Sequence, residues 1–224
     1  MKARKFLRRW HASGFADRRD AGAALAAALA GYAGNPDVLV IGLARGGVPV
    51  AAVVADVLGA ELDVLVVRKL GIPGREELAL GAISRDRMVL NDRLVTDLGL
   101  GQREIDAVLA RERRELHRRE SAYRSGRSGV TVAGRIVLLV DDGLATGASM
   151  RVAALTMRAA GAGRVVVAVP TGPASMSEDL CGPADDVVCV HTPRPFIAVG
   201  LSYRNFDQVS DAEVIAALAG GART

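Results

Sequence analysis

Short runs of valine, leucine and isoleucine recur along the chain, and each is followed by glycine or polar residues and then by a segment with helical periodicity. Strands that are buried on both faces have continuous apolar runs of this kind. The pattern therefore predicts an α/β protein with a parallel sheet flanked by helices. The five predicted strands span residues 38–41, 64–67, 136–140, 165–169 and 187–190.

The spacing of apolar residues predicts five helices between and around these strands. Gly59 and Gly161 stand just after two of them, where a left-handed residue commonly ends a helix. The predicted helices span residues 17–33, 48–58, 102–123, 149–160 and 211–219.

The segment 71–87 interrupts this alternation of strands and helices. It has glycine and proline at its start, then a brief apolar stretch, and then charged residues. We interpret such a segment as a lid or a small excursion rather than as a sheet strand.

The composition is that of one intracellular domain. Half of the 224 residues are apolar, which is enough for a sizeable core. Cys181 and Cys189 lack a Cys-x-x-Cys spacing, and we interpret them as buried thiols in the reducing cytoplasm. Residues 1–14 form a basic extension, and the alanine-rich stretch 21–34 follows charged residues, so we expect a helix there rather than an export signal. No run of strongly apolar residues is long enough to predict a membrane span.

The net charge is +4, and only three of the 29 basic residues are lysines. Such a balance suits anionic small molecules and RNA alike. Arginines are dense in the predicted helix 102–123, where glutamates are interspersed with them. This helix is either a solvated face with compensating charges or a surface for RNA or a protein partner.

Cationic, acidic and glycine-rich residues follow the predicted strands. In open parallel sheets ligands bind beyond the carboxyl ends of the strands, so these residues are expected to share one rim. They are residues 43–47, 68–69, 141–149, 170–172 and 191–196.

The stretch VLLVDDGLATGASM, residues 137–150, combines two kinds of site on this rim. Backbone amides at the start of the helix that follows Gly147 would bind an anion such as a phosphomonoester, with hydroxyl groups nearby as further donors. Asp141 and Asp142 would repel a phosphate, so we expect them to accept hydrogen bonds from hydroxyls or to help hold a hydrated cation.

Three other phosphate-handling motifs do not fit this chain. A Walker loop needs a lysine directly after its last glycine, and Gly147 is followed by alanine. The dinucleotide fingerprint Gly-x-Gly-x-x-Gly is absent from residues 42–47 and 143–147. A phosphoacceptor receiver domain needs a lysine far downstream, and no lysine follows Lys69.

The stretch at 137–149 resembles the signature of type I phosphoribosyltransferases, in which an apolar strand leads into two acidic residues and an Ala-Thr-Gly-x-Ser/Thr turn. Residues 42–51 resemble the pyrophosphate loop of that family, and residues 67–83 resemble the segment that leads into its mobile lid. The order of these segments agrees with the family over residues 15–219.

The resemblance implies a Rossmann-like type I phosphoribosyltransferase fold. Its core would span residues 15–190, with a mobile lid at 71–87 and the arginine-rich helix at 102–123, and a C-terminal hood and tail would span 191–224. The family also implies a homodimer.

The implied substrate is phosphoribosyl pyrophosphate (PRPP) with Mg²⁺, which would be held mainly through PRPP or directly by Asp141 and Asp142. Loss of pyrophosphate from ribose leaves an oxocarbenium-like centre and a highly charged leaving group, which require nearby cations and exclusion of water. The implied catalytic residues are Asp141, Asp142, Arg45 and Lys69, and those for pyrophosphate are Arg45, Gly46 and Lys69. The implied 5′-phosphate-binding residues are Ala145, Thr146, Gly147, Ala148 and Ser149.

One position and one segment bear on the acceptor. Relatives that use 6-oxopurines typically have an aspartate at the position of Ala145, so hypoxanthine or guanine is disfavoured. The segment 191–211 would form the hood over the base, with Phe196 or Tyr203 stacked on its ring and Phe206 as readily a core residue.

Two functions fit the sequence. The first is an Mg²⁺-dependent enzyme that transfers the 5-phosphoribosyl group of PRPP to a nitrogenous base or a related nitrogen nucleophile. The second is a PRPP- or nucleotide-sensing regulator that binds RNA or a protein partner without turnover. Phosphorolysis of a nucleotide would use the same site as the first.

Overall fold

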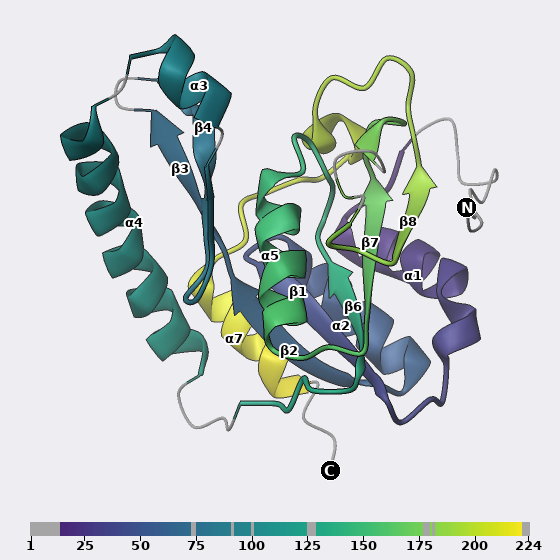
Figure 1. The fold of residues 1–224 in the computed structure, drawn as a ribbon. Helices are drawn as coiled ribbons and strands as arrows, with labels where there is room; N and C mark the ends of the chain where they lie inside the picture. Colours follow the sequence, from purple (N-terminus) through teal and green to yellow (C-terminus); the bar gives the residue numbers. More distant parts are fainter. Residues whose placement is uncertain are drawn as a thin grey trace.

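The computed structural model describes residues 14–72, 75–90, 92–99, 101–124, 129–176, 180 and 182–220. Figure 1 shows a central parallel sheet with helices on both faces, and a long helix that stands to one side with a smaller sheet. Cys181 and all but the last residue of the predicted basic extension lie outside the described residues.

Five parallel strands form the main sheet, in the order β2-β1-β6-β7-β8. All five predicted strands are present, and the α/β class is confirmed. The order reverses between β1 and β6, which leaves a crevice at the carboxyl ends of these two strands. The strands span Val38–Ala44 (β1), Glu61–Val66 (β2), Ile136–Val140 (β6), Arg164–Thr171 (β7) and Asp186–His191 (β8).

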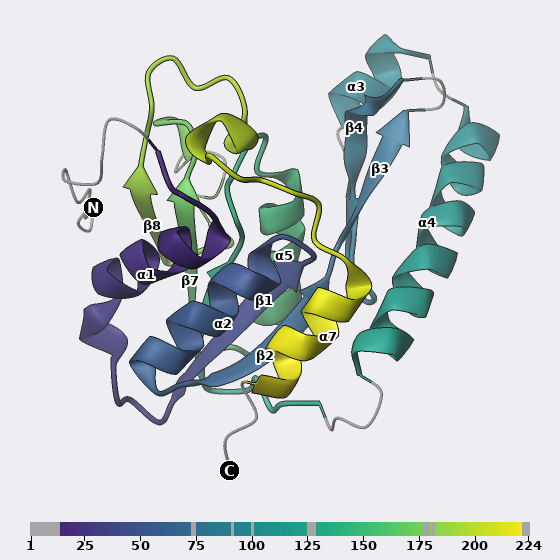
Figure 2. The ribbon, with the colours of Figure 1, turned by 180° about the vertical axis from the view of Figure 1, so that it is seen from behind.

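Helices cover both faces of this sheet (Figures 1 and 2). Alternate residues of the strands enter two separate apolar clusters, so that Val40 packs with α1, α2 and α7 while Leu39 packs with α5. Gly59 and Gly161 have φ values of +65° and +83°, which confirms their predicted role at helix ends. The helices span Arg18–Ala28 (α1), Gly47–Leu58 (α2), Ala148–Ala159 (α5) and Asp211–Gly220 (α7).

The first predicted helix, 17–33, ends earlier than expected. Asp17 caps its start by accepting hydrogen bonds from the backbone amides of Arg19 and Asp20 at 2.8 and 2.9 Å. The chain then tightens into a short 3-10 turn, η1, at Ala30–Tyr32. None of the helices in the described part of the chain has the length and apolar content needed to cross a bilayer.

A second, antiparallel sheet lies beside the main one, in the order β3-β4-β5. The expectation that 71–87 holds no sheet strand was therefore wrong. These strands pair with each other within a short stretch of chain, so the segment lacks the strand-then-helix rhythm of the main sheet. That it closes as a lid stays a prediction. The strands span Arg68–Ile72 (β3), Arg75–Ile83 (β4) and Met88–Leu90 (β5).

Two helices follow this second sheet. The short α3 spans Asp92–Asp97, and the long α4 spans Gln102–Tyr123, which are the bounds predicted for the arginine-rich helix. Figure 2 shows α4 at the side of the molecule, with its C-terminal half close to α7.

The chain after β8 returns to the N-terminal segment. Phe15 donates its backbone amide to Ser202 O at 2.7 Å and accepts from the Arg204 amide at 2.8 Å, which forms a parallel bridge with Tyr203. The short 3-10 turn η2, Val199–Ser202, precedes this bridge, and α7 follows it and packs beside α2 and α4.

Truncation of a central strand residue should destabilise the fold. Leu139 is fully buried in β6, so Leu139→Ala should lower the free energy of unfolding by about 2–5 kcal/mol in chemical denaturation. Leu201→Ala is the matched control, because Leu201 is 71% exposed and its truncation should change stability by less than about 0.5 kcal/mol. Equal losses for the two variants would contradict the packing described here.

Candidate active site

A cavity of about 440 Å³ opens at the carboxyl edge of the main sheet, next to the crevice between β1 and β6. The loops after β1 and β6, the start of β3 and the segment before α7 form its walls. All ten residues predicted for PRPP line it: Arg45, Gly46, Lys69, Asp141, Asp142, Ala145, Thr146, Gly147, Ala148 and Ser149.

The acidic pair, Asp141 and Asp142, directly follows the buried strand β6. The Asp142 carboxylate accepts a hydrogen bond from Arg18 Nε at 2.9 Å, and its backbone amide donates to Asp141 Oδ1 at 2.9 Å. Burial and the charge of Asp142 raise the pKa of Asp141 well above its usual range, against the opposing effect of Lys69. Burial also raises the pKa of Asp142, although Arg18 counteracts this. Because ionising this pair is costly in the free protein, a ligand that supplies hydroxyl donors or a cation would favour its charged form.

The turn at residues 145–149 leads from the acidic pair into α5. Gly147 has a φ of +76° at the N-cap of the helix, a conformation that side chains disfavour. Leu144 anchors the turn, because its side chain is buried and its amide donates to Thr171 O at 2.9 Å. The first amides of α5 have no partners within the helix, and the residues that carry them line the cavity. They can therefore bind an anion.

The loop after β1 brings Arg45 and Gly46 against the acidic pair. A side chain at Gly46 would collide with the Asp142 carboxylate, so glycine lets the loop backbone come this close without displacing Asp142. The peptide bond between Ala44 and Arg45 is cis.

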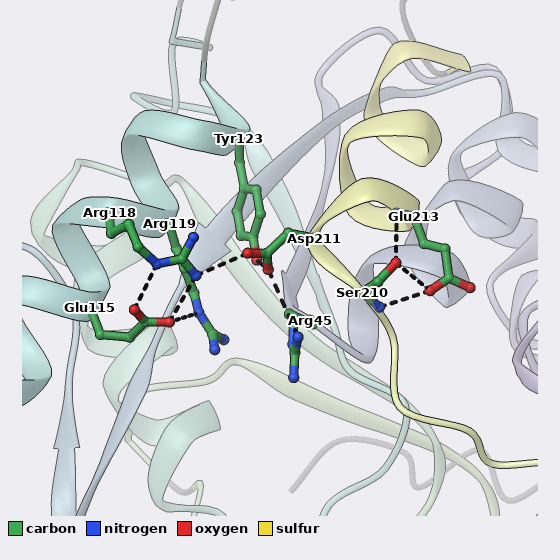
Figure 3. A network of polar contacts seen from close by, with 8 residues as sticks. All are labelled: Arg45, Glu115, Arg118, Arg119, Tyr123, Ser210, Asp211 and Glu213. Atoms are coloured by element: carbon green, nitrogen blue, oxygen red, sulfur yellow. Dashed lines mark hydrogen bonds and ion pairs between the residues drawn. The ribbon is translucent and has the colours of Figure 1, made fainter.

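Arg45 also takes part in a polar network with α4 and α7 (Figure 3). Its guanidinium lies 3.9 Å from Asp211 Oδ1, the oxygen that accepts a hydrogen bond from the Tyr123 hydroxyl at 2.6 Å. Burial and this hydrogen bond raise the pKa of Tyr123 to about 12. Ser210 and Glu213 form a reciprocal cap at the start of α7, which holds Asp211 in place.

The model of the phosphoribosyl transferase domain family matches residues 16–203 of this sequence. The chain belongs to the phosphoribosyl transferase domain family.

Two proteins from Mycobacterium tuberculosis strains CDC 1551 / Oshkosh and ATCC 25618 / H37Rv, both named "Putative phosphoribosyl transferase", are each 52% identical to this chain over 205 residues. The match covers 91% of this chain and 46% of each of those proteins, so the chain spans about half the length of these curated relatives. The crystal structure of TT1426 from Thermus thermophilus is 45% identical, has a TM-score of 0.75, and is matched over 92% of this chain and 97% of that one.

Arg18 is a residue of this phosphoribosyl transferase domain that the sequence analysis missed. It lines the cavity from the start of α1, pairs with Asp142, and places its guanidinium 4.0 Å from the centre of the Phe206 ring. It also donates to Asp207 O at 2.7 Å. These contacts join segments more than 100 residues apart. In the sequence, nothing distinguishes Arg18 from other arginines near the start of a helix.

The structure shows where two of the aromatic residues predicted for the hood lie. Tyr203 is 8% exposed, its hydroxyl donates to the Asp142 backbone oxygen, and its ring packs between Phe15 and Phe206. Tyr203 is not among the described residues that line the cavity. Phe196 is not among the described residues that line the cavity, whereas Phe206 is.

The described residues contain no cluster of three or more histidine, cysteine, aspartate or glutamate side chains that could hold a metal ion by itself. The acidic pair supplies two carboxylates, and one of them already binds Arg18. Oxygen donors of this kind suit Mg²⁺, but a complete shell would need oxygens from a ligand.

Removal of one acidic charge should stabilise the protein in a pH-dependent way. The raised pKa of Asp141 means that folding favours its protonated form, so its contribution to stability falls as the pH rises above the unfolded-state pKa towards the folded-state pKa. Asp141→Asn should therefore raise Tm at pH 7 by roughly 2–4 °C, which corresponds to about 1 kcal/mol in a domain of this size. The gain should shrink as the pH is lowered towards 4.

The control for this melting experiment is Asp37→Asn, at an exposed aspartate before β1 on the opposite edge of the sheet. Its Tm should follow the parent protein at each pH. A gain for Asp141→Asn that is equal at pH 4 and pH 7, or a loss at pH 7, would contradict the electrostatic explanation.

Proposed function

We propose that this chain is an Mg²⁺-dependent phosphoribosyltransferase that transfers the 5-phosphoribosyl group of PRPP to a nitrogenous base or a related nitrogen nucleophile and releases pyrophosphate. The observation that carries the proposal is the division of one cavity into an acidic part and an anion-binding part. Family membership supports the use of PRPP, and the residue roles are inferred from the geometry.

The two charged groups of PRPP and its ribose hydroxyls match three parts of the cavity wall. The 145–149 turn offers amides and hydroxyls to the 5′-phosphate at the start of α5. Asp141 and Asp142 accept hydrogen bonds from the ribose hydroxyls. Arg45, Gly46 and Lys69 receive the pyrophosphate, because Arg45 and Lys69 supply cations and Gly46 leaves room for close backbone approach.

Magnesium fits this arrangement as a partner of PRPP. Two partly buried carboxylates lie side by side with one paired guanidinium, and burial raises the pKa of both because their negative charge is poorly solvated there. A cation brought by pyrophosphate oxygens would neutralise that charge and, when bound, would also neutralise the leaving group.

The chain's own residues would act on the charge that develops during transfer. As the bond from C1 of ribose to the pyrophosphate oxygen breaks, electrons pass to the leaving oxygen, which Arg45 and Lys69 stabilise. The acceptor nitrogen then bonds to C1, and its proton passes to the departing pyrophosphate. Lys69 lies in β3, so the sheet β3-β4-β5 adjoins the cavity, and its closure over the cavity would exclude water from the cationic centre.

The acceptor would lie at the Phe206 side of the cavity. Phe206, Arg18 and Val209 form a wall there with one aromatic ring, one guanidinium and one aliphatic surface. Ala145 offers no carboxylate for the ring proton of a 6-oxopurine, which favours other bases. The sensor hypothesis shares the PRPP site, but it has no turnover and adds the binding of RNA or a protein partner.

The test is pyrophosphate release from PRPP with Mg²⁺, measured against a panel of purine and pyrimidine bases. Release should depend on one base and fall roughly 100-fold or more in an Asp141→Asn/Asp142→Asn variant, because the ribose contacts are lost. Asp37→Asn is the matched control and should retain full activity, since it lies on the far edge of the sheet. PRPP binding without release under any base would favour the sensor.

A further inference from the structure

A second cavity, of about 430 Å³, adjoins the first. Lys69, Asp141 and Ser149 line both cavities. Three residues of α4 line the second cavity, namely Arg111, Glu112 and Arg119. Leu43 at the end of β1 and Val67 just after β2 also line it. The arginine-rich helix therefore faces the edge of the PRPP site.

The charge of this second cavity is positive. Four cationic side chains line it, against the two acidic residues Glu112 and Asp141. Glu112 is buried and lies between two guanidiniums, with Arg68 Nη2 at 2.6 Å and Arg111 Nε at 3.0 Å from its oxygens. One carboxylate shared by two arginines leaves an excess of positive charge for a ligand. The four cationic residues are Arg68, Lys69, Arg111 and Arg119.

Arg119 is the α4 arginine best placed to use that charge. Its side chain is only 13% exposed, and its Nε donates to Glu115 Oε1 at 2.7 Å. This bond fixes the side chain while the two terminal nitrogens carry four further N–H donors. A planar guanidinium fixed in this way is suited to bidentate binding of a phosphate group.

We propose that Arg111 and Arg119 of α4 extend the pyrophosphate site, so that pyrophosphate binds between Lys69 and the arginine-rich helix. The proposal rests on the function proposed above. Pyrophosphate fits because it carries several negative charges on a compact group and would already contact Lys69, which is shared by the two cavities. The 5′-phosphate is accounted for by the 145–149 turn. No aromatic side chain is found among the described residues that line the second cavity, so a base is not favoured there.

The polar network of Figure 3 holds α4 in register with the loop after β1. Arg118 binds Glu115 and also donates to Asp211 at 2.9 Å, and Asp211 lies near Arg45. Tyr123 of the same helix also donates to Asp211 at 2.6 Å, so α4 stays tied to the loop that carries Arg45 when Arg118 is removed. Arg118 itself is half-exposed and is not among the described residues that line either cavity.

Arg118 and Arg119 form a matched pair for a test, because both bind Glu115 and only Arg119 lines the second cavity. The probe is pyrophosphate with Mg²⁺, titrated into the full chain by calorimetry without PRPP or base. Arg119→Ala should weaken pyrophosphate binding at least 10-fold and Arg111→Ala at least 3-fold. Arg118→Ala and Arg113→Ala should each stay within 2-fold of the parent protein.

A second variant separates binding from structure. Glu115→Gln weakens the ion pair but leaves Arg119 in the cavity, so pyrophosphate affinity should be kept or increased. If Glu115→Gln lowers pyrophosphate affinity as much as Arg119→Ala does, Arg119 stabilises the helix rather than binding pyrophosphate. That result would overturn the proposal. Unchanged affinity in both Arg119→Ala and Arg111→Ala would also overturn it. If Arg113→Ala and Arg118→Ala weaken pyrophosphate binding as much as Arg119→Ala does, α4 binds polyanions through a diffuse charged surface. That result would also overturn the proposal.

The binding experiment is independent of turnover. If pyrophosphate binding depends on Arg119 but no base causes the release of pyrophosphate from PRPP, the enzyme proposal fails while the extended anion site stands. If base-dependent release occurs but Arg119→Ala leaves pyrophosphate affinity unchanged, the enzyme proposal stands and the extended site fails.

Discussion

The contacts that hold Asp142 are the constraint on which the whole site depends. Its carboxylate binds Arg18 from α1, and its backbone oxygen accepts the hydroxyl of Tyr203 from the C-terminal segment. A partly buried carboxylate without such partners would destabilise the fold. The two acidic residues at the end of β6 therefore require α1 and the C-terminal segment to pack against β6. Gly46 then lets the loop after β1 reach the same point, because any side chain there would meet the Asp142 carboxylate.

Local patterns in the sequence were sufficient for most of the fold and for the centre of the site. Continuous apolar runs predicted the five strands of the main sheet, and Gly59 and Gly161 end helices with positive φ as expected. The acidic pair and the 145–149 turn belong to one strand-turn-helix unit, so their relation in space is set by local geometry. Short-range chemistry of this kind can be predicted from a single sequence.

Features that depend on contacts between distant segments could not be predicted in the same way. Arg18 reaches Asp142 across 124 positions, and only packing decides that Phe206 rather than Tyr203 faces the cavity. The residues of 71–87 pair with their own neighbours in a second sheet. For the arginine-rich helix, the sequence allowed a solvated face or a partner surface, whereas the structure divides its arginines between an exposed face and a cavity wall, as Arg118 and Arg119 show.

The bridge between Phe15 and Tyr203 has a consequence for synthesis of the chain. Closing a loop of this length costs entropy and must wait until both ends exist, so the bridge forms only after the C-terminal segment has left the ribosome. Until then the acidic pair lacks Tyr203, and Arg18 lacks Phe206 and the backbone oxygen of Asp207. A nascent chain therefore cannot hold a ligand that needs the whole cavity, and such a ligand stabilises only chains whose translation has passed this segment.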